Sequence, residues 1–238
     1  MADRPVSHQG RAGSDPADKE RDNAAMPTHL VQAVLFDLDG TLIDSTASVN
    51  RNWRIIADLM GRPHEDIVGK FHGMPGSQAL QLVDPSIGAD EIAKLNKVLI
   101  DGETSDTEDV VALPGAAQAL AALPTDRWAI VTSCPPRLAE ARLRAAGLPR
   151  PRTLVTADDI TNGKPHPDPF RLGAAAMGHR PQDCLAVEDA PAGITSAQAA
   201  GCLVLGLETT HTVLDADTVK DLSQVTFENE ADGIRVTW

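Results

Sequence analysis

Aromatic side chains are scarce in this 238-residue chain, which has three Trp, four Phe and no Tyr. Proteins that stack nucleic-acid bases or sugar rings on aromatic platforms need such side chains, so neither kind of cleft is expected. Basic residues are also few, because 21 Lys and Arg stand against 34 Asp and Glu, giving a formal net charge of −13. A charge of that sign repels nucleic acids and anionic membrane surfaces. We therefore predict no nucleic-acid partner and no membrane partner.

Cysteines are few and lack metal-ligand or redox spacing. The three present, Cys134, Cys184 and Cys202, form no Cys-x-x-Cys pair. An odd number of such thiols indicates reduced cysteines rather than a disulfide framework. No apolar run reaches the roughly 18 residues of a membrane span, and the first residues have no apolar signal core. These features predict a cytoplasmic protein. The lack of heptads or of a sustained apolar stripe predicts a monomer or a weak homodimer.

Apolar residues make up 42% of the chain, which is ample for a core. Residues 1–29 have no hydrophobic period and are predicted to be a flexible N-terminal tail. After them, short apolar runs alternate with stretches of helical spacing that end at Gly. The predicted strands span 31–36, 128–132, 184–187 and 202–207, and the predicted helices span 115–123, 137–146, 169–177 and 191–200. This alternation predicts an α/β fold, a doubly wound parallel sheet built from residues 30–45 and 111–238.

Residues 46–110 break the alternation, because helical spacing recurs there without an intervening strand. The predicted helices span 46–60, 64–71, 77–83 and 89–101. We expect a small helical domain inserted after the first strand, with Pro114 and Gly115 marking the return to the sheet.

Two carboxylates end the first predicted strand, in the segment FDLDGTL at 36–42. Asp37 can act as a nucleophile, and Asp39, on the same side two residues later, can exchange protons with the group that Asp37 attacks. Gly40 permits a tight turn that brings the backbone close to a ligand. A calcium loop would need acidic or amide residues at its fifth position, Gly at its sixth and Glu at its twelfth. Those positions hold Thr41, Leu42 and Ser48, so a calcium loop is excluded.

Three further segments place polar groups after predicted strands or in a stiff loop. Thr132 and Ser133 follow a strand, where hydroxyls can donate to phosphate oxygens, although helix capping would explain them equally well. Lys164 lies in GKPHP (163–167), where prolines reduce the entropy cost of presenting its ammonium group. Glu188 and Asp189 follow another strand and supply the hard oxygen ligands that Mg²⁺ prefers.

Taken together and in this order, the four segments resemble the motifs of the haloacid dehalogenase superfamily. The matching residues are Asp37-Leu38-Asp39-Gly40-Thr41, Thr132, Lys164 and Glu188-Asp189. The helical insertion is similar to the C1-type cap of that superfamily. The segments LPTDRWAIVTS (123–133), TADDI (156–160) and GKPHPDP (163–169) further resemble the branch of glycerol-3-phosphatases and 2-deoxyglucose-6-phosphatases. That resemblance implies a phosphoric monoester hydrolase that acts on small sugar or polyol phosphates.

The resemblance also implies a mechanism. Asp37 would attack phosphorus to form an aspartyl phosphate, while Asp39 would first protonate the leaving alkoxide and then deprotonate the attacking water. The implied cofactor is Mg²⁺, held by Asp37, the Asp39 carbonyl and Asp189, with Glu188 close to it. Thr132 and Lys164 would stabilise the transferring phosphoryl group. The remaining residues expected to bind phosphate or substrate are Leu38 and Gly40 through their backbone, Ser133, and His72 from the cap.

Other reactions on the same fold fit the sequence less well. A phosphosugar mutase of the β-phosphoglucomutase type would carry a histidine about twelve residues after its nucleophile and an arginine in the cap, but 47–50 hold no histidine and 73–80 hold no basic residue. A dehalogenase would not need the metal-binding acids, and a phosphonatase would need a cap lysine, for which Lys70 is unremarkable. A catalytically inactive binding module would have lost one of the two carboxylates, and both are present.

Overall fold

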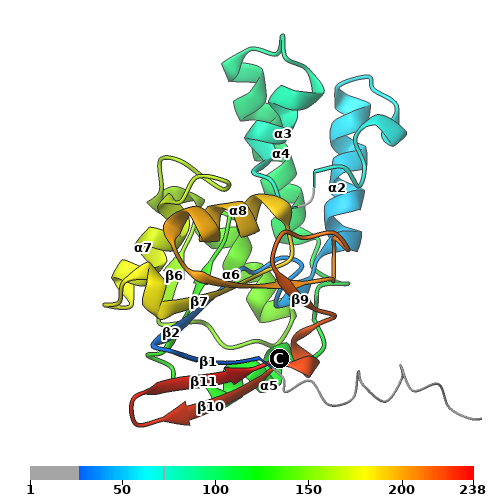
Figure 1. The fold of residues 1–238 in the computed structure, drawn as a ribbon. Coiled ribbons are helices and arrows are strands. Elements are labelled where there is room, and N and C mark those ends of the chain that lie inside the picture. The colour runs from blue at the N-terminus through cyan, green and yellow to red at the C-terminus, as the bar shows by residue number, and fades with distance from the viewer. Residues whose placement is uncertain (1–26, 72) are drawn as a thin grey trace, which may run out of the picture.

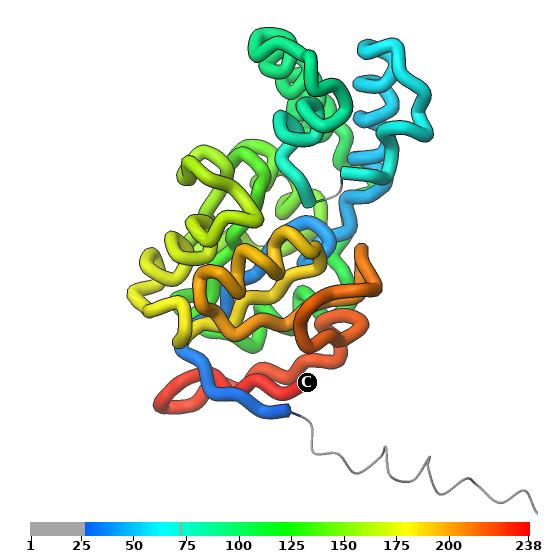
Figure 2. The backbone as a smooth tube through the Cα atoms, turned by 45° about the horizontal axis from the view of Figure 1, so that its top comes forward, coloured from blue at the N-terminus to red at the C-terminus, as the bar shows by residue number. Residues whose placement is uncertain are grey.

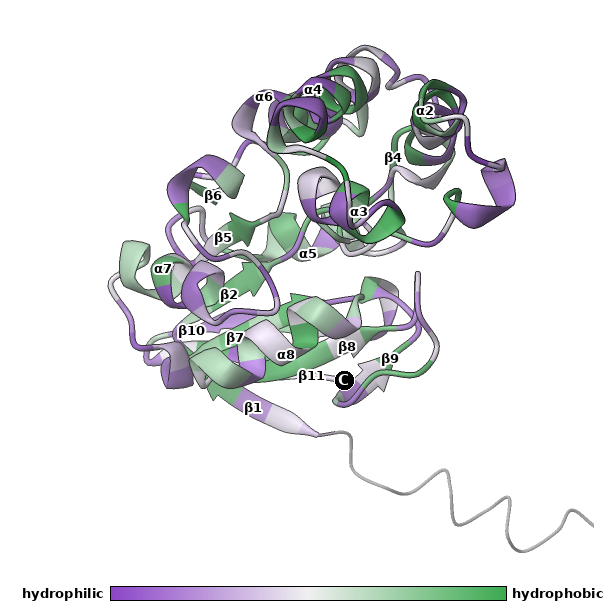
Figure 3. Ribbon diagram, turned by 90° about the horizontal axis from the view of Figure 1, so that it is seen from above, coloured by the Kyte–Doolittle hydropathy of each residue, from purple (hydrophilic) through white to green (hydrophobic). Residues whose placement is uncertain are grey.

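The computed structural model describes residues 27–71 and 73–238, and Figure 1 shows their arrangement. Its centre is a parallel sheet of six strands in the order β6-β5-β2-β7-β8-β9. These strands are β2 (Ala33–Phe36), β5 (Trp128–Val131), β6 (Thr153–Val155), β7 (Cys184–Glu188), β8 (Leu203–Leu207) and β9 (Asp217–Val219). Every residue of β2, β5 and β7 is buried, as expected for strands covered on both faces. Figure 3 accordingly colours the central strands as hydrophobic.

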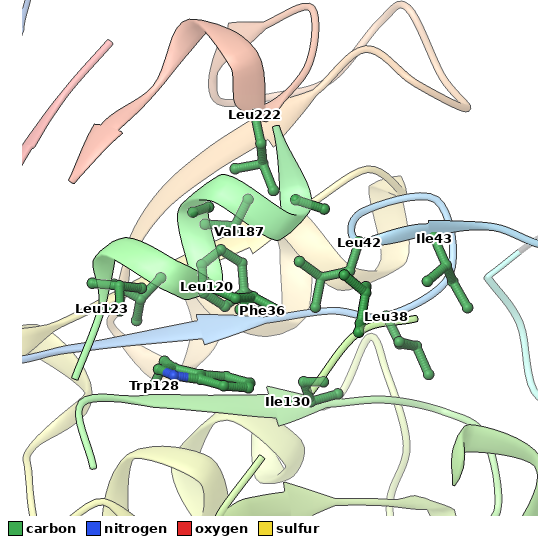
Figure 4. Packing of buried hydrophobic residues seen from close by; sticks show 14 of the residues in the cluster. Phe36, Leu38, Leu42, Ile43, Leu120, Leu123, Trp128, Ile130, Val187 and Leu222 are labelled. Carbon is green, nitrogen blue, oxygen red and sulfur yellow. The ribbon is translucent and has the colours of Figure 1, made fainter. Parts of the chain in front are cut away.

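Helices cover both faces of this sheet. The covering helices are α5 (Ala116–Ala122), α6 (Pro136–Ala145), α7 (Asp168–Ala176) and α8 (Pro191–Ala200). Alternate residues of β2 point to opposite faces, so Val34 and Phe36 pack with α5 and α6, whereas Ala33 and Leu35 pack with α7 and α8. Figure 4 shows Phe36 beside α5, with side chains of β5 on the same face. The predicted doubly wound α/β fold is confirmed.

A second sheet is missing from the sequence-based prediction. Strands β1 (Thr28–Val31), β10 (Thr226–Glu230) and β11 (Gly233–Thr237) form an antiparallel sheet in the order β1-β11-β10. Residues 28 and 29, predicted to be tail, therefore belong to a strand, and the predicted strand 31–36 is divided at Gln32. The local sequence gives no sign of this division, because β1 pairs with a strand near the C-terminus, where Val31 lies opposite Ile234. Residues 1–26 of the predicted tail lie outside the described residues.

Residues 46–110, here called the helical segment, stand above the sheet in Figures 1 and 2. They contain α2 (Thr46–Leu59), α3 (Gly76–Val83) and α4 (Ala89–Ser105), which pack around their own buried cluster, including Trp53, Ile56 and Leu99. The predicted helix 64–71 is wrong: only a single 3₁₀ turn, His64–Asp66, forms, and Gly69 has a φ of +80° that ends regular helix. A short antiparallel pair, β3 (Ile43–Asp44) with β4 (Val111–Ala112), joins the helical segment to the sheet.

The remaining short elements are 3₁₀ turns at 157–159, 181–183 and 222–224. Within the described residues, none of the helices combines the length and the apolar character needed to cross a bilayer. Because β2, β5 and β7 run parallel, their carboxyl ends meet at one edge of the sheet. The polar residues that follow these strands therefore lie close together.

Candidate active site

A cavity of about 220 Å³ lies between the carboxyl edge of the sheet and the helical segment. The sheet side contributes Asp37, Asp39, Gly40, Thr132, Ser133 and Asp189, together with Cys134 and Arg142. The helical segment contributes Val49, Trp53, Phe71, Met74, Ser77, Asn96, Leu99 and Glu103. The sheet side of the cavity is thus strongly charged, and the helical-segment side is mostly apolar with the polar side chains of Ser77, Asn96 and Glu103.

Lys164 is buried beneath the sheet side of the cavity, where it joins two strands. Its ammonium group donates to Asp37 Oδ1, to Glu188 Oε1 at 2.6 Å and to the Val131 carbonyl at 3.0 Å. Only 4% of the residue is exposed, and the ring of Phe170 lies 5.2 Å from Nζ. Burial disfavours the charged form, but the Asp37 and Glu188 carboxylates outweigh it and raise the pKa of Lys164. Lys164 is therefore a fixed positive charge beside Asp37.

The ammonium group of Lys164 contacts two members of a cluster of three carboxylates. Carboxylate oxygens of Asp37, Glu188 and Asp189 lie within 4.8 Å of one another, and all three residues are buried. Burial raises the pKa of Asp37 well above its usual range, opposed by Lys164 and reinforced by the other two carboxylates. Burial and the Glu188 charge likewise raise the pKa of Asp189 to about 7. One ammonium group does not balance three carboxylates, so a hard divalent cation such as Mg²⁺ fits this oxygen donor set.

Two glycines make room for the carboxylates. A Cβ on Gly193 would lie 1.8 Å from Glu188 Oε1, and a Cβ on Gly40 would lie 2.1 Å from Asp189 Oδ2. Gly40 also has a φ of +86°, which other residues rarely adopt. Glu188 Oε2 accepts the backbone N–H of Asp189 at 3.1 Å and that of Ala190 at 3.2 Å, which fixes its orientation. Glycine at positions 40 and 193 thus allows the backbone to lie against the carboxylates of Asp189 and Glu188.

The side chain of Asp39 has a different environment from that of Asp37. Its Oδ1 accepts from Ser45 Oγ at 2.7 Å, and its Oδ2 lies 2.9 Å from Arg142 Nη1. The Cys134 thiol also donates to Oδ2, at 3.0 Å. The Asp39 carboxylate therefore contacts a guanidinium, a hydroxyl and a thiol, and it is not a member of the Asp37, Glu188 and Asp189 cluster. Two carboxylates placed in such different surroundings can serve different roles in one reaction.

Arg142 and Glu103 are cavity residues that the sequence analysis missed. Arg142 Nη2 donates to Glu103 Oε2 at 2.8 Å, so α6 of the sheet layer is linked to α4 of the helical segment. Burial raises the pKa of Glu103 to about 7, against the opposing charge of Arg142. One signal for Arg142 is available in the sequence, because it falls four residues after Leu138 on the buried face of α6. A basic residue at an inward-facing helix position indicates a buried charge partner.

The other predicted site residues divide into two groups. Thr132 and Ser133 line the cavity, and Thr132 Oγ1 accepts the Cys134 N–H at 3.1 Å. Leu38 does not line it, because the residue is fully buried in the core. His72 lies outside the described residues. The structure therefore brings predicted residues that follow β2, β5 and β7 to the wall of one cavity.

This chain is similar to known hydrolases in both sequence and fold. Residues 31–201 match the family described as haloacid dehalogenase-like hydrolase. Hexitol phosphatase A of Escherichia coli is 39% identical over 208 residues, covering 84% of this chain and 95% of that protein. Glycerol-1-phosphate phosphohydrolase 2 of Saccharomyces cerevisiae is 33% identical over 204 residues, covering 80% and 79%. A solved hydrolase from Pseudomonas syringae superposes with a TM-score of 0.73 at 26% identity, covering 81% and 94%.

Proposed function

Because this chain belongs to the haloacid dehalogenase-like hydrolases, we propose that it is a Mg²⁺-dependent phosphatase for monoesters of small sugars or polyols. The observation that carries the proposal is the pair Asp37 and Asp39, two residues apart but in different environments. Asp37 adjoins Lys164 and the acidic cluster, whereas Asp39 adjoins Arg142 and faces the cavity. The relatives named hexitol phosphatase and glycerol-1-phosphate phosphohydrolase support the class of substrate.

In the first half of the reaction, an Asp37 carboxylate oxygen attacks phosphorus and the bond from phosphorus to the ester oxygen breaks. Asp39, protonated at that stage, gives its proton to the departing alkoxide, which leaves as an alcohol. The product on the enzyme is an aspartyl phosphate. The two-step route helps because an acyl phosphate is hydrolysed more readily than an alkyl ester.

In the second half, Asp39 takes a proton from water as that water attacks the phosphorus of the aspartyl phosphate. The acyl-phosphate bond breaks, inorganic phosphate forms and Asp37 regains its carboxylate. Asp39 is again protonated, so the cycle is closed without any other acid or base. Asp37 adjoins Lys164 and Asp39 adjoins Arg142, and such different surroundings suit two carboxylates with different roles in one reaction.

The metal would be held by carboxylates of Asp37 and Asp189, with Glu188 adjoining. We propose the Asp39 carbonyl as a further ligand. When bound, Mg²⁺ supplies positive charge that allows an anionic phosphate to approach an anionic nucleophile. Lys164 contributes a permanent positive charge beside Asp37 and Glu188. The Thr132 and Ser133 hydroxyls and the Leu38 backbone N–H are proposed to bind the phosphoryl oxygens, an electrostatic contribution that is usually large. The Gly40 N–H, expected to share this role, donates instead to the Ile43 carbonyl at 2.8 Å.

We propose that the helical segment is a cap over this site, and that His72 contributes to it from the cap. On the helical-segment side of the cavity, Trp53 and Phe71 offer apolar surface to a carbon chain, while Ser77 and Asn96 offer hydrogen bonds to its hydroxyls. Such a mixture suits a small polyol or sugar attached to the phosphate. Cap closure would exclude bulk water from the phosphoryl group until the alcohol has left.

The proposal is tested by measuring inorganic phosphate released from hexitol phosphates, glycerol phosphates, hexose 6-phosphates and deoxyhexose phosphates. We expect release that requires Mg²⁺, stops on chelation and is absent in Asp37→Asn. The exposed Asp126→Asn is the control and should keep wild-type rates. Substantial turnover by Asp37→Asn, or no release from any of these esters, would contradict the proposal.

A phosphosugar mutase is the second candidate, supported by 28% identity to β-phosphoglucomutase of Bacillus subtilis over 211 residues. The lack of a histidine at 47–50 and of a basic residue at 73–80 favours the hydrolase. The same assay separates the two, because a mutase converts a hexose 1-phosphate to the 6-phosphate without net phosphate release. A requirement for a hexose bisphosphate would indicate the mutase.

A further inference from the structure

Three charged side chains that line the cavity connect the helical segment to Asp39. Glu103 Oε2 of α4 accepts from Arg142 Nη2 of α6 at 2.8 Å, and Arg142 Nη1 lies 2.9 Å from Asp39 Oδ2. Arg142 is only 2% exposed, and Glu103 is also buried. None of the metal-cluster carboxylates takes part in this connection.

A buried charged triad of this kind is costly to desolvate, and replacing such groups by apolar ones is often neutral or stabilising. Stability alone therefore does not account for Arg142. Its position on α6 places the guanidinium against one carboxylate oxygen of Asp39, while Ser45 Oγ donates to the other oxygen at 2.7 Å. Both oxygens of Asp39 are thus held, and rotation of the carboxylate about its Cβ–Cγ bond is opposed from two sides.

We propose that Arg142 is a positioning residue that orients the Asp39 carboxylate for proton transfer, and that Glu103 fixes the Arg142 guanidinium. This inference rests on the proposed role of Asp39 as acid and base. Because Glu103 belongs to the helical segment, Asp39 is fully oriented only while α4 packs on α6. The acid–base group is thereby coupled to the segment that covers the substrate.

The competing explanation is that Arg142 only joins α4 to α6. The chain offers a matched control, because Arg137 of α6 also pairs with α4, through Asp101 at 3.4 Å. Arg137 is exposed and does not line the cavity. Arg137→Met therefore removes the same charge from the same helix pair without touching Asp39.

The experiment compares Arg142→Met, Arg142→Lys, Glu103→Gln and Arg137→Met on two esters. Glycerol phosphate has an alkoxide leaving group that needs a proton, whereas 4-nitrophenyl phosphate has a leaving group that departs without one. General acid catalysis contributes about 10²–10⁴-fold, so we expect Arg142→Met to lower kcat for glycerol phosphate by about 100-fold with little change in KM. Arg142→Lys should restore part of this loss, and Glu103→Gln should show a smaller loss of the same kind.

Rapid-quench kinetics give a readout that a structural role would not change. With 4-nitrophenyl phosphate, Arg142→Met should release about one equivalent of nitrophenol in a fast burst and then turn over slowly, because Asp39 must still activate water in the second half. With glycerol phosphate it should show no burst of glycerol. Thermal denaturation checks folding. If Arg142→Met does not fold, kcat and the burst are compared between Arg137→Met and the milder variants Arg142→Lys and Glu103→Gln.

The inference is overturned if Arg142→Met and Arg137→Met lower kcat for both esters to the same extent and neither shows a nitrophenol burst. It is also overturned if Arg142→Met keeps the wild-type kcat. Failure of the proposed function would look different, because Asp37→Asn would then remain active. An inactive Asp37→Asn with a fully active Arg142→Met removes the inference about Arg142 and leaves the phosphatase proposal standing.

Discussion

The ammonium group of Lys164 lies 2.6 Å from Glu188 Oε1 and also donates to Asp37 Oδ1, which joins strands β7 and β2 at their carboxyl ends. A single buried cation thus compensates the proposed nucleophile and the acidic cluster together. Asp189 is left as the third carboxylate, without a basic partner of its own at hydrogen-bond distance among the described residues. This residual negative charge is the physical basis for expecting a bound cation.

Replacing Lys164 by Met should lower kcat and raise KM, because the phosphoryl group loses a positive charge beside Asp37. Breaking one partner of a buried ion pair costs about 3–5 kcal/mol, so the free energy of unfolding should also fall. Kinetics with a sugar phosphate and urea denaturation measure the two effects. The exposed Lys97→Met, which breaks a surface pair with Asp101, should change stability far less, because solvent screens such pairs. Wild-type kinetics in Lys164→Met would show that the lysine is only structural.

Replacing Gly193 by Ala should displace Glu188, since the new Cβ would lie 1.8 Å from Glu188 Oε1. Overpacking of this kind costs about 1–3 kcal/mol, and the shifted carboxylate should weaken Mg²⁺ binding. Calorimetric titration with Mg²⁺ and thermal denaturation test both expectations. Gly88→Ala is the control, because its Cβ would meet nothing within 4 Å. Equal Mg²⁺ affinity in the two variants would contradict the expected displacement.

The stabilisation by Mg²⁺ should increase with pH. The pKa of Asp189 is raised from 3.8 to about 7 in the fold, so between these values the native state binds more protons than the unfolded chain. The free energy of unfolding without metal therefore falls as pH rises through this interval. Above pH 7 the carboxylate is ionised and free to bind the cation without releasing a proton.

Differential scanning calorimetry at pH 6 and pH 8, with and without Mg²⁺, measures this dependence. We expect the Mg²⁺-induced rise in Tm to be clearly larger at pH 8. In Asp189→Asn the rise should be small at both values, since the titrating ligand is gone. A metal-induced rise that is the same at pH 6 and pH 8 in the wild type would refute the assignment of Asp189.

The aspartyl phosphate should be detectable as a covalent adduct of about one phosphate per chain. Asp37→Asn should form none, because the attacking oxygen is lost. Asp39→Asn should accumulate it when supplied with 4-nitrophenyl phosphate, because the leaving group needs no proton but the hydrolytic water does. Intact-protein mass spectrometry after acid quench distinguishes the two variants. An adduct in Asp37→Asn would place the nucleophile elsewhere.

Local patterns in the sequence were sufficient for much of the fold. The apolar run before Asp37 predicts β2 because a strand covered on both faces needs apolar side chains throughout. Gly147, Gly178 and Gly201 mark helix ends, and each has the positive φ that favours glycine after a helix. The carboxylates after β2 and β7 were predicted to meet because parallel strands place their carboxyl ends at one edge. The family assignment from those motifs is confirmed by the match over residues 31–201.

Other features were decided only by the tertiary structure. Strand β1 exists because its backbone pairs with β11, more than 200 positions away, and a short run such as THLV carries no local sign of that partner. The ion pairs from Glu103 through Arg142 to Asp39 likewise join three segments that are far apart in the chain, and no local sequence pattern predicts that they meet. Backbone pairing and charge pairing depend on distance in space, whereas hydrophobic period and turn residues act between neighbours in the chain. The sequence by itself therefore determined the four central strands of the sheet, the helices that cover it and the acidic residues that follow its strands. The outer strands β6 and β9, the pairing of Lys164 with Asp37 and Glu188, and the pairing of Arg142 with Asp39 and Glu103 were decided by the folded arrangement.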